Sequence, residues 1–414
     1  MARVVRRLLL CVAICGAALV TATGRLAGGD PPTAADQELL FLKQHWRVPI
    51  PPQGRPPARF SALEASLDPE SCAVCHRSQH EDWRGSVHST SMGPGVVGQT
   101  IELIQDDPST AILCYGCHAP LAEQQEKVRR AKGSRSRFER NPAFLASLQA
   151  KGLSCAGCHV RSHRRYGPPR LDGSLKNSRP ISKLPHRGAI RTTAFERSEF
   201  CKACHQFEAD GPALNGTLLE NTYNEWKESS YAREGRSCQS CHMPGRRHTW
   251  RGIHDPEMVR SGVTVRLTRG DARDRVEATI AIANTGVGHY FPTYVTPKIV
   301  VRFELVDAAN NRVPGSLQEE RIGREVTLDL GQELFDTRIP PGQIRTVRYV
   351  GTIAGPGLSL RASVIVVPDD FYVKFFEAIA PRARSERARA LLEQALAEAQ
   401  NSSFVLFKEV IPVS

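Results

Sequence analysis

After residue 20, the chain of 414 residues has no apolar run of the roughly 20 residues that a membrane-spanning helix needs. It has no low-complexity tract large enough to suggest wholesale disorder. It has no cysteine after Cys241, and between the N-terminal segment and that residue none stands outside one repeated pattern. These absences exclude a multispan membrane protein and a disordered chain. They indicate a globular protein long enough for two domains.

The first 22 residues have the layout of a secretory signal peptide. Arg3, Arg6 and Arg7 precede an apolar run over residues 8–20, and small residues follow it. We expect cleavage after Ala22 and export to the periplasm or the extracellular space. An uncleaved N-terminal membrane anchor is the alternative that the sequence leaves open.

The ten cysteines that follow form five C-x-x-C pairs, and a histidine comes directly after each pair. Zinc held by four cysteines uses two pairs per site, so five pairs leave one stranded. Disulfides suit an exported protein but give the histidines no role, and a dithiol switch is expected once rather than five times. Covalent haem explains every feature, because two thiols add to one porphyrin and the adjacent histidine ligates its iron.

We therefore predict five c-type haems, one for each motif. The cofactor-binding cysteines are Cys72, Cys75, Cys114, Cys117, Cys155, Cys158, Cys201, Cys204, Cys238 and Cys241, and the proximal iron ligands are His76, His118, His159, His205 and His242.

The composition and residue patterns of the sequence change along the chain, and these changes predict its domains. Residues 23–70 are rich in proline and indicate an extended leader on the surface. The motifs occupy residues 71–256, at intervals of 42, 41, 46 and 37 residues, with sparse secondary structure between them. Residues 257–370 are expected to form a β-domain, and residues 371–414 to add helices and a last strand packed on it.

The β-domain is predicted from short runs with period-2 alternation or β-branched residues, separated by turns. We expect an antiparallel β-sandwich of the immunoglobulin-like class. The fold class is therefore α+β, with a haem-packed, mostly irregular and helical domain before the sandwich. The runs lie at 263–270, 275–284, 298–307, 344–350 and 358–367, and a helical pattern follows at 385–400.

Each iron has a second axial position, and eight histidines outside the motifs can supply it. His163 lies four residues after a proximal histidine, and four residues span at most about 14 Å. It can hardly reach the far face of its own haem, although it can serve a neighbour. His248 is marginal for its own haem, His254 has ample reach, and His186 lies in a loop fifteen residues before a motif. We predict His186 and His254 as distal ligands and leave one place contested between His163 and His248.

The stretch "CAVCHRSQHEDWRGSVH" (72–88) resembles the Trp-x-x-Ser-x-His pattern of exported multihaem cytochromes c related to the nitrifiers' tetrahaem cytochrome and the hydroxylamine-oxidoreductase group. "SEFCKACHQF", "YNEWKESSYAREGRSCQSCHMP" and "GIHDPE" are similar to segments of a branch whose haem domain precedes a β-domain. This resemblance covers roughly residues 40–370. It implies that His88 is a distal ligand and that His289, in "GVGHYFPT", lies over a haem. The chain departs from the pattern in "WKESSY", where Tyr231 replaces a histidine and either packs on a porphyrin or ligates iron.

These features predict an electron carrier that works outside the cytoplasm with redox partner proteins, among them a membrane-associated electron-transfer complex. The alternative is a multihaem oxidoreductase that acts on nitrite, hydroxylamine or tetrathionate at one open haem. The net charge of +12 becomes +9 without the three arginines of the signal peptide. Basic stretches at 127–140 and 161–170 fit haem propionates or an acidic redox partner, and the predicted compartment disfavours nucleic acid.

Overall fold

The computed structural model describes residues 33–129, 137–270, 275–352 and 355–413. The chain divides into two compact units, Met1–Gln37 and Glu38–Ser414. The predicted signal peptide and its cleavage site lie outside the described residues. Among the described helices, none is long and apolar enough to cross a membrane.

The C-x-x-C-H motifs lie on short helices or at their ends. Local caps limit these helices at their N-terminal ends: Asp68 accepts the N–H of Glu70, and Asp107 accepts the N–H groups of Ser109 and Thr110. The motif helices are α3 (Pro69–Ala73), α6 (Pro108–His118), α8 (Cys155–His159), α9 (Glu199–His205) and α12 (Cys238–His242).

The rest of the motif region consists of short elements, as its sparse patterning predicts. The other helices are α1 (Ala34–His45), α2 (Ala62–Ala65), α4 (Arg77–Arg84), α5 (Pro94–Asp106), α7 (Ala146–Gln149), α10 (Thr222–Lys227), α11 (Ser230–Arg233) and α13 (Pro256–Gly262). The short strands are β1 (Lys127–Arg129), β2 (Phe138–Arg140), β3 (Val160–Arg161), β4 (Arg164–Gly167), β5 (Ile190–Arg191), β6 (Ala213–Leu214) and β7 (Thr217–Leu218).

The segment expected to be an extended surface leader is partly packed. It contains helix α2, and Ile50 is fully buried. Ile50 donates its N–H to the carbonyl of Pro120 (2.7 Å) and accepts from the N–H of Ala122 (2.9 Å). This part of the chain is therefore fixed beside the second motif.

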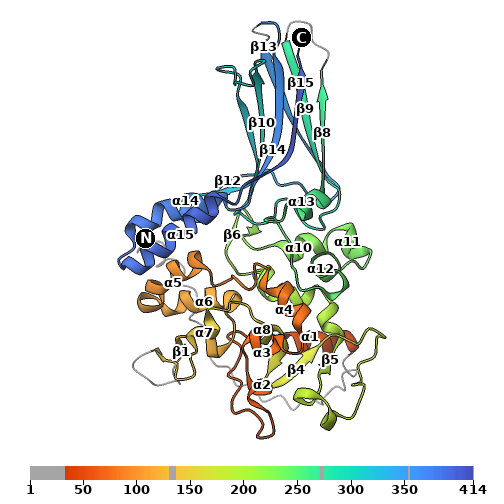
Figure 1. Ribbon diagram of the computed structural model, residues 1–414, viewed down its shortest axis with the longest axis vertical. Coiled ribbons are helices and arrows are strands. Elements are labelled where there is room, and N and C mark those ends of the chain that lie inside the picture. Colours follow the sequence, from red (N-terminus) through yellow and green to blue (C-terminus); the bar gives the residue numbers. More distant parts are fainter. Residues whose placement is uncertain (1–32, 130–136, 271–274, 353–354, 414) are drawn as a thin grey trace, which may run out of the picture. The chain divides into compact units, whose positions relative to one another are not determined.

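The C-terminal region contains two antiparallel sheets (Figure 1). One has the strand order β12-β11-β10-β14-β15 and the other the order β13-β9-β8. Each predicted run forms a strand, so the α+β class is confirmed, whereas β11 and β12 were not predicted. The strands are β8 (Val263–Arg269), β9 (Arg275–Asn284), β10 (Lys298–Val306), β11 (Gln318–Val326), β12 (Glu333–Asp336), β13 (Ile344–Thr352), β14 (Ser359–Val367) and β15 (Phe404–Pro412).

Both sheets contribute to one hydrophobic core. Ile280 and Ile282 of β9, from the smaller sheet, are fully buried in the same cluster as Phe303 of β10 and Val364 of β14. Alternate residues of β9 are buried, which is the pattern of a strand with one face toward a core.

The helices α14 (Asp370–Ile379) and α15 (Glu386–Gln400) follow β14, and β15 then pairs with β14. Helix α15 packs against α5 of the motif region. A Cβ atom on Gly98 would lie 2.8 Å from Cγ of Leu392, so the glycine permits this close approach. Arg384 donates to Glu102 (3.2 Å) at the same contact. The C-terminal segment therefore also contacts the motif region and not the β-domain alone.

Candidate haem-binding sites

The ten motif cysteines are free thiols in the structure. Three pairs of thiols from different motifs interact directly with each other. The first motif thus meets the third, the second meets the fourth, and the fourth meets the fifth. The pairs are Cys72 with Cys155, Cys117 with Cys204, and Cys201 with Cys238.

Three pairs of histidine rings face each other at almost the same separation. Each pair joins the histidine of a motif to one outside the motifs. Two imidazoles that share one iron through Nε2 have ring centroids roughly 6 Å apart, from two metal–nitrogen bonds of about 2 Å and the radii of the two rings. The observed separations fit this requirement. They are 6.2 Å for His159 and His248, 6.3 Å for His205 and His88, and 6.4 Å for His242 and His289.

The ring nitrogens of these histidines are arranged as in metal ligands, which donate one ring N–H to a protein acceptor and bind the metal with the other nitrogen. In one group, Nδ1 donates to a backbone carbonyl. The bonds run from His118 to Ser91 (2.6 Å), His159 to Tyr166 (2.8 Å), His186 to Gly188 (3.0 Å), His242 to Arg251 (2.8 Å), His248 to Arg246 (3.0 Å) and His289 to Tyr290 (2.9 Å).

A second group uses Nε2 itself in a hydrogen bond to the protein. Nε2 of His45 donates to the carbonyl of Cys158 (2.8 Å), and Nε2 of His163 donates to the carbonyl of Gly54 (3.0 Å). Nε2 of His254 bonds a carboxylate oxygen of Asp369 (2.9 Å), and its side chain is 46% exposed. Each of these Nε2 atoms is already hydrogen-bonded to a protein group. Among the described residues, neither His163 nor His254 lies opposite a motif histidine.

His186 lies close to the first motif. Burial lowers the pKa of His186, and positive charge at Arg165 and His76 acts in the same direction. Charge at His76 lowers the pKa of His159 and His248 in the same way, so His186 is one of several histidines near the first motif.

Burial keeps the facing histidines neutral, which is the form that binds a metal. It lowers the pKa of His88 to about 3, and the pKa of His159, His205 and His289 to about 4. Charge on a neighbouring histidine adds to burial at each position. None of the four is protonated near pH 7.

Two residues singled out by the sequence stand apart from these pairs. Tyr231 donates its hydroxyl to the carbonyl of Thr285 (2.9 Å), and the guanidinium of Arg236 lies 4.6 Å from its ring centroid. His118 has no histidine ring opposite it among the described residues.

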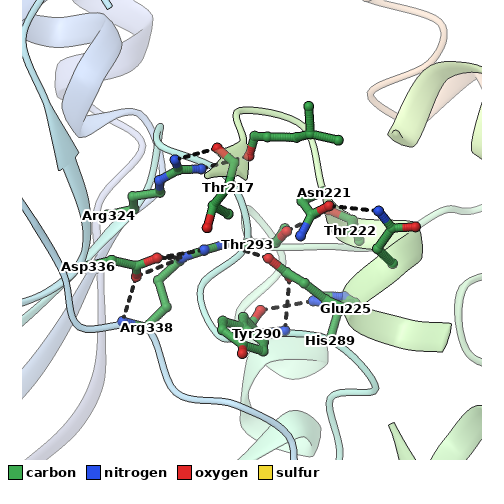
Figure 2. A network of polar contacts seen from close by, with 12 residues as sticks. Thr217, Asn221, Thr222, Glu225, His289, Tyr290, Thr293, Arg324, Asp336 and Arg338 are labelled. Atoms are coloured by element: carbon green, nitrogen blue, oxygen red, sulfur yellow. Dashed lines mark hydrogen bonds and ion pairs between the residues drawn. The ribbon is translucent and has the colours of Figure 1, made fainter. Parts of the chain in front are cut away.

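The loop after β9 presents His289 to the fifth motif and is held by a buried ion pair (Figure 2). Nη1 of Arg338 donates to Oε1 of Glu225 (2.7 Å), and these side chains are 2% and 3% exposed. Oε2 of Glu225 accepts the backbone N–H of Tyr290 (3.1 Å), and the guanidinium lies 5.1 Å from the Tyr290 ring centroid. The ion pair thus fixes the residue that directly follows His289.

Arg324 of β11 makes a second link between the β-domain and the motif region. Its side chain is fully buried. The guanidinium donates to the carbonyls of Leu218 (2.7 Å), Thr217 (2.9 Å) and Leu214 (3.2 Å), and Nε donates to Glu333 (2.7 Å). An arginine at this position is stabilised only because each donor meets an acceptor.

Sequence reasoning missed two residues beside these histidines. Oη of Tyr294 lies 2.6 Å from Nδ1 of His205. The ring centroid of Trp250 lies 4.7 Å from that of His88 and 5.1 Å from that of His248. The contacts of Tyr294 with His205 and of Trp250 with His88 join residues far apart in the chain, and no local motif signals them.

The comparisons with known proteins agree with this geometry. Residues 71–160 match the family of cytochrome c554 and c-prime. The structure resembles a penta-haem cytochrome c552 from Thermochromatium tepidum, with 18% sequence identity, a TM-score of 0.58, and coverage of 85% of this chain and 100% of that chain. A structural genomics target, SoR45, is 12% identical over 36% of this chain and 86% of its own. Its TM-score of 0.18 is too low to indicate a shared fold. No curated protein matches the chain.

Residues 71–160 are thus similar to the multihaem c-type cytochromes of the cytochrome c554 and c-prime family. The free thiols, the facing imidazoles and the available Nε2 atoms fit covalent haem. Proteins of this class transport electrons through haem iron.

Proposed function

We propose that the protein is a pentahaem c-type cytochrome that transfers electrons outside the cytoplasm. The observation that carries this proposal is the set of three histidine pairs with centroids 6.2–6.4 Å apart. In each pair the motif histidine is the proximal ligand and the other histidine is the distal one. The haem supplies the one-electron chemistry when bound, and the protein supplies its attachment, its axial ligands and its insulation from water.

The proposed distal ligands are His88, His186, His248 and His289. His248 is preferred to His163 for the contested place, because Nε2 of His163 is bonded to Gly54. His254 leaves the proposed set for the same reason, because its Nε2 is bonded to Asp369.

The contacts between motifs support an order for electron flow. The paired thiols link the first motif to the third, and the fourth to both the second and the fifth. Cys158 of the third motif lies close enough to influence Cys201 and Cys204 of the fourth. We therefore infer that the fourth haem is the junction of the array. Redox partner proteins, among them a membrane-associated complex, exchange electrons at its ends.

Mass spectrometry and electron paramagnetic resonance test this proposal together. The mature protein is expected to carry five haem additions, and its ferric spectrum to contain four low-spin haems. His248→Ala should convert one of them to high spin, whereas the matched control His254→Ala should leave the spectrum unchanged. Fewer than five additions, or the opposite behaviour of the two variants, contradicts the proposal.

One observation favours a second function, the conversion of a small nitrogen or sulfur compound at an open haem. His118 donates Nδ1 to Ser91 in the manner of a ligand, yet no described histidine ring faces it. The iron of the second haem would then keep an open coordination position. Cyanide, carbon monoxide and nitrite should each alter the spectrum of a single haem, and the absence of any change removes this alternative.

The remaining assignments belong to the same proposal. The two sheets with a common core are inferred to form the immunoglobulin-like sandwich. The signal peptide and export are inferred from residues 1–22. Cell fractionation of the tagged full chain, with detection by haem staining, tests the compartment.

A further inference from the structure

Tyr294 lies at the end of the loop that carries His289, and its hydroxyl meets the fourth motif. Oη is 2.6 Å from Nδ1 of His205, and the two rings are inclined by 23°. The backbone of Tyr294 has a φ of 64°, which bulky residues rarely adopt. Such a conformation persists only where the surrounding structure imposes it.

The direction of this hydrogen bond follows from the role proposed for His205. An imidazole that gives its Nε2 lone pair to iron carries its hydrogen on Nδ1. Nδ1 therefore donates, and the phenol oxygen of Tyr294 accepts. The hydroxyl of Thr222 is a second hydrogen-bond partner of the phenol, as a donor to Oη. Burial raises the pKa of Tyr294 well above its ordinary value, so the phenol remains neutral.

His205 differs in this respect from two other motif histidines. His159 and His242 donate Nδ1 to backbone carbonyls, at 2.8 Å each. An acceptor on Nδ1 increases the basicity of the ligand, which stabilises ferric iron and lowers the reduction potential. A phenol oxygen accepts less strongly than a peptide carbonyl, because its lone pair is delocalised into the ring. His205 is accordingly the weakest donor of these three ligands.

We propose that Tyr294 is a positioning residue that acts through His205 to raise the reduction potential of the fourth haem above those of the third and fifth. This inference rests on the proposed pentahaem function. Electrons that enter the array at either end then collect at its junction. The β-domain would thus supply an axial ligand to one haem and set the potential of the next.

Spectroelectrochemical titration of the full mature chain tests the proposal. Tyr294→Phe removes the acceptor and is expected to shift one of the five midpoint potentials upward, without loss of a low-spin haem. Thr222→Val removes a competing donor from the phenol oxygen, which strengthens the acceptor for Nδ1 and should shift the same potential downward by a smaller amount. Tyr349→Phe, whose hydroxyl donates to the carbonyl of Ser316 within the β-domain (3.2 Å), is the matched control and should leave all five potentials unchanged.

The outcomes separate this inference from the function on which it rests. Fewer than five haems in the wild-type protein overturn the proposed function before any titration. Five haems with potentials that Tyr294→Phe leaves unchanged or shifts downward overturn the role of Tyr294 alone. If Tyr294→Phe does not take up five haems, Thr222→Val decides, and unchanged potentials in that variant overturn the proposal.

Discussion

Replacing Arg338 with methionine removes the cation from the buried pair that holds the His289 loop. Glu225 then keeps only the N–H of Tyr290, at 3.1 Å, in a site where its side chain is 3% exposed. Burial already raises the pKa of Glu225, and Arg338 opposes that rise. Loss of one partner from a buried pair costs about 3–5 kcal/mol, because it leaves a charge without compensation.

Hydrogen exchange measured by mass spectrometry is the suitable assay, because it reports the opening of one loop in a protein with several haems. A loss of about 3–5 kcal/mol corresponds to exchange that is roughly 100-fold to several thousand-fold faster. We expect this acceleration in peptides that cover residues 284–294. Arg338→Met combined with Glu225→Gln should recover much of the protection, because the fully buried position is then neutral and the other partner of Arg338, Asp336, is 25% exposed.

The matched control is Arg345→Met, also in the β-domain. Arg345 and Glu320 form an ion pair at 2.9 Å, but their side chains are 42% and 36% exposed. A surface pair contributes only about 0–1 kcal/mol, so exchange should change less than about fivefold. Exchange in Arg338→Met that is no faster than in this control would refute the reasoning. A double variant as unprotected as the single one would refute it as well.

The strands of the β-domain were predictable where inward and outward residues alternate in polarity, as in β9. Strand β11 was not predicted, because one of its inward-facing residues is Arg324, which is fully buried. When strands are predicted from the alternation of apolar and polar residues, an arginine is assigned to the solvent-facing side. Its burial depends on carbonyls more than a hundred residues earlier, at Leu214, Thr217 and Leu218.

A proximal ligand can be predicted from the sequence, because the expected attachment is local, with both thiols and the imidazole inside five residues. Distal ligation is a long-range property. His248 lies six residues after His242, yet it faces His159. Sequence separation bounds how far a histidine reaches from its own motif, but it does not tell which neighbouring haem lies within that reach. Tyr294 illustrates the same limit, because nothing in its sequence context signals the bond to His205.

Three further predictions follow from individual side chains. His186→Ala should convert the haem of the first motif to high spin in the ferric spectrum, and an unchanged spectrum removes His186 from the ligand set. Burial raises the pKa of Glu220 to about 8, so the protonated carboxyl favours the folded state and stability should fall as pH rises from about 4.5 to 8. Glu220→Gln should abolish that slope in urea midpoints measured across this range, and an equal slope in both proteins contradicts the assignment. His289→Ala should convert the fifth haem to high spin and increase proteolysis near residues 254–262, because loss of the iron bond removes one of the links between the loop and the motif region. Normal low-spin spectra with unchanged proteolysis would mean that His289 does not join the β-domain to the haem array.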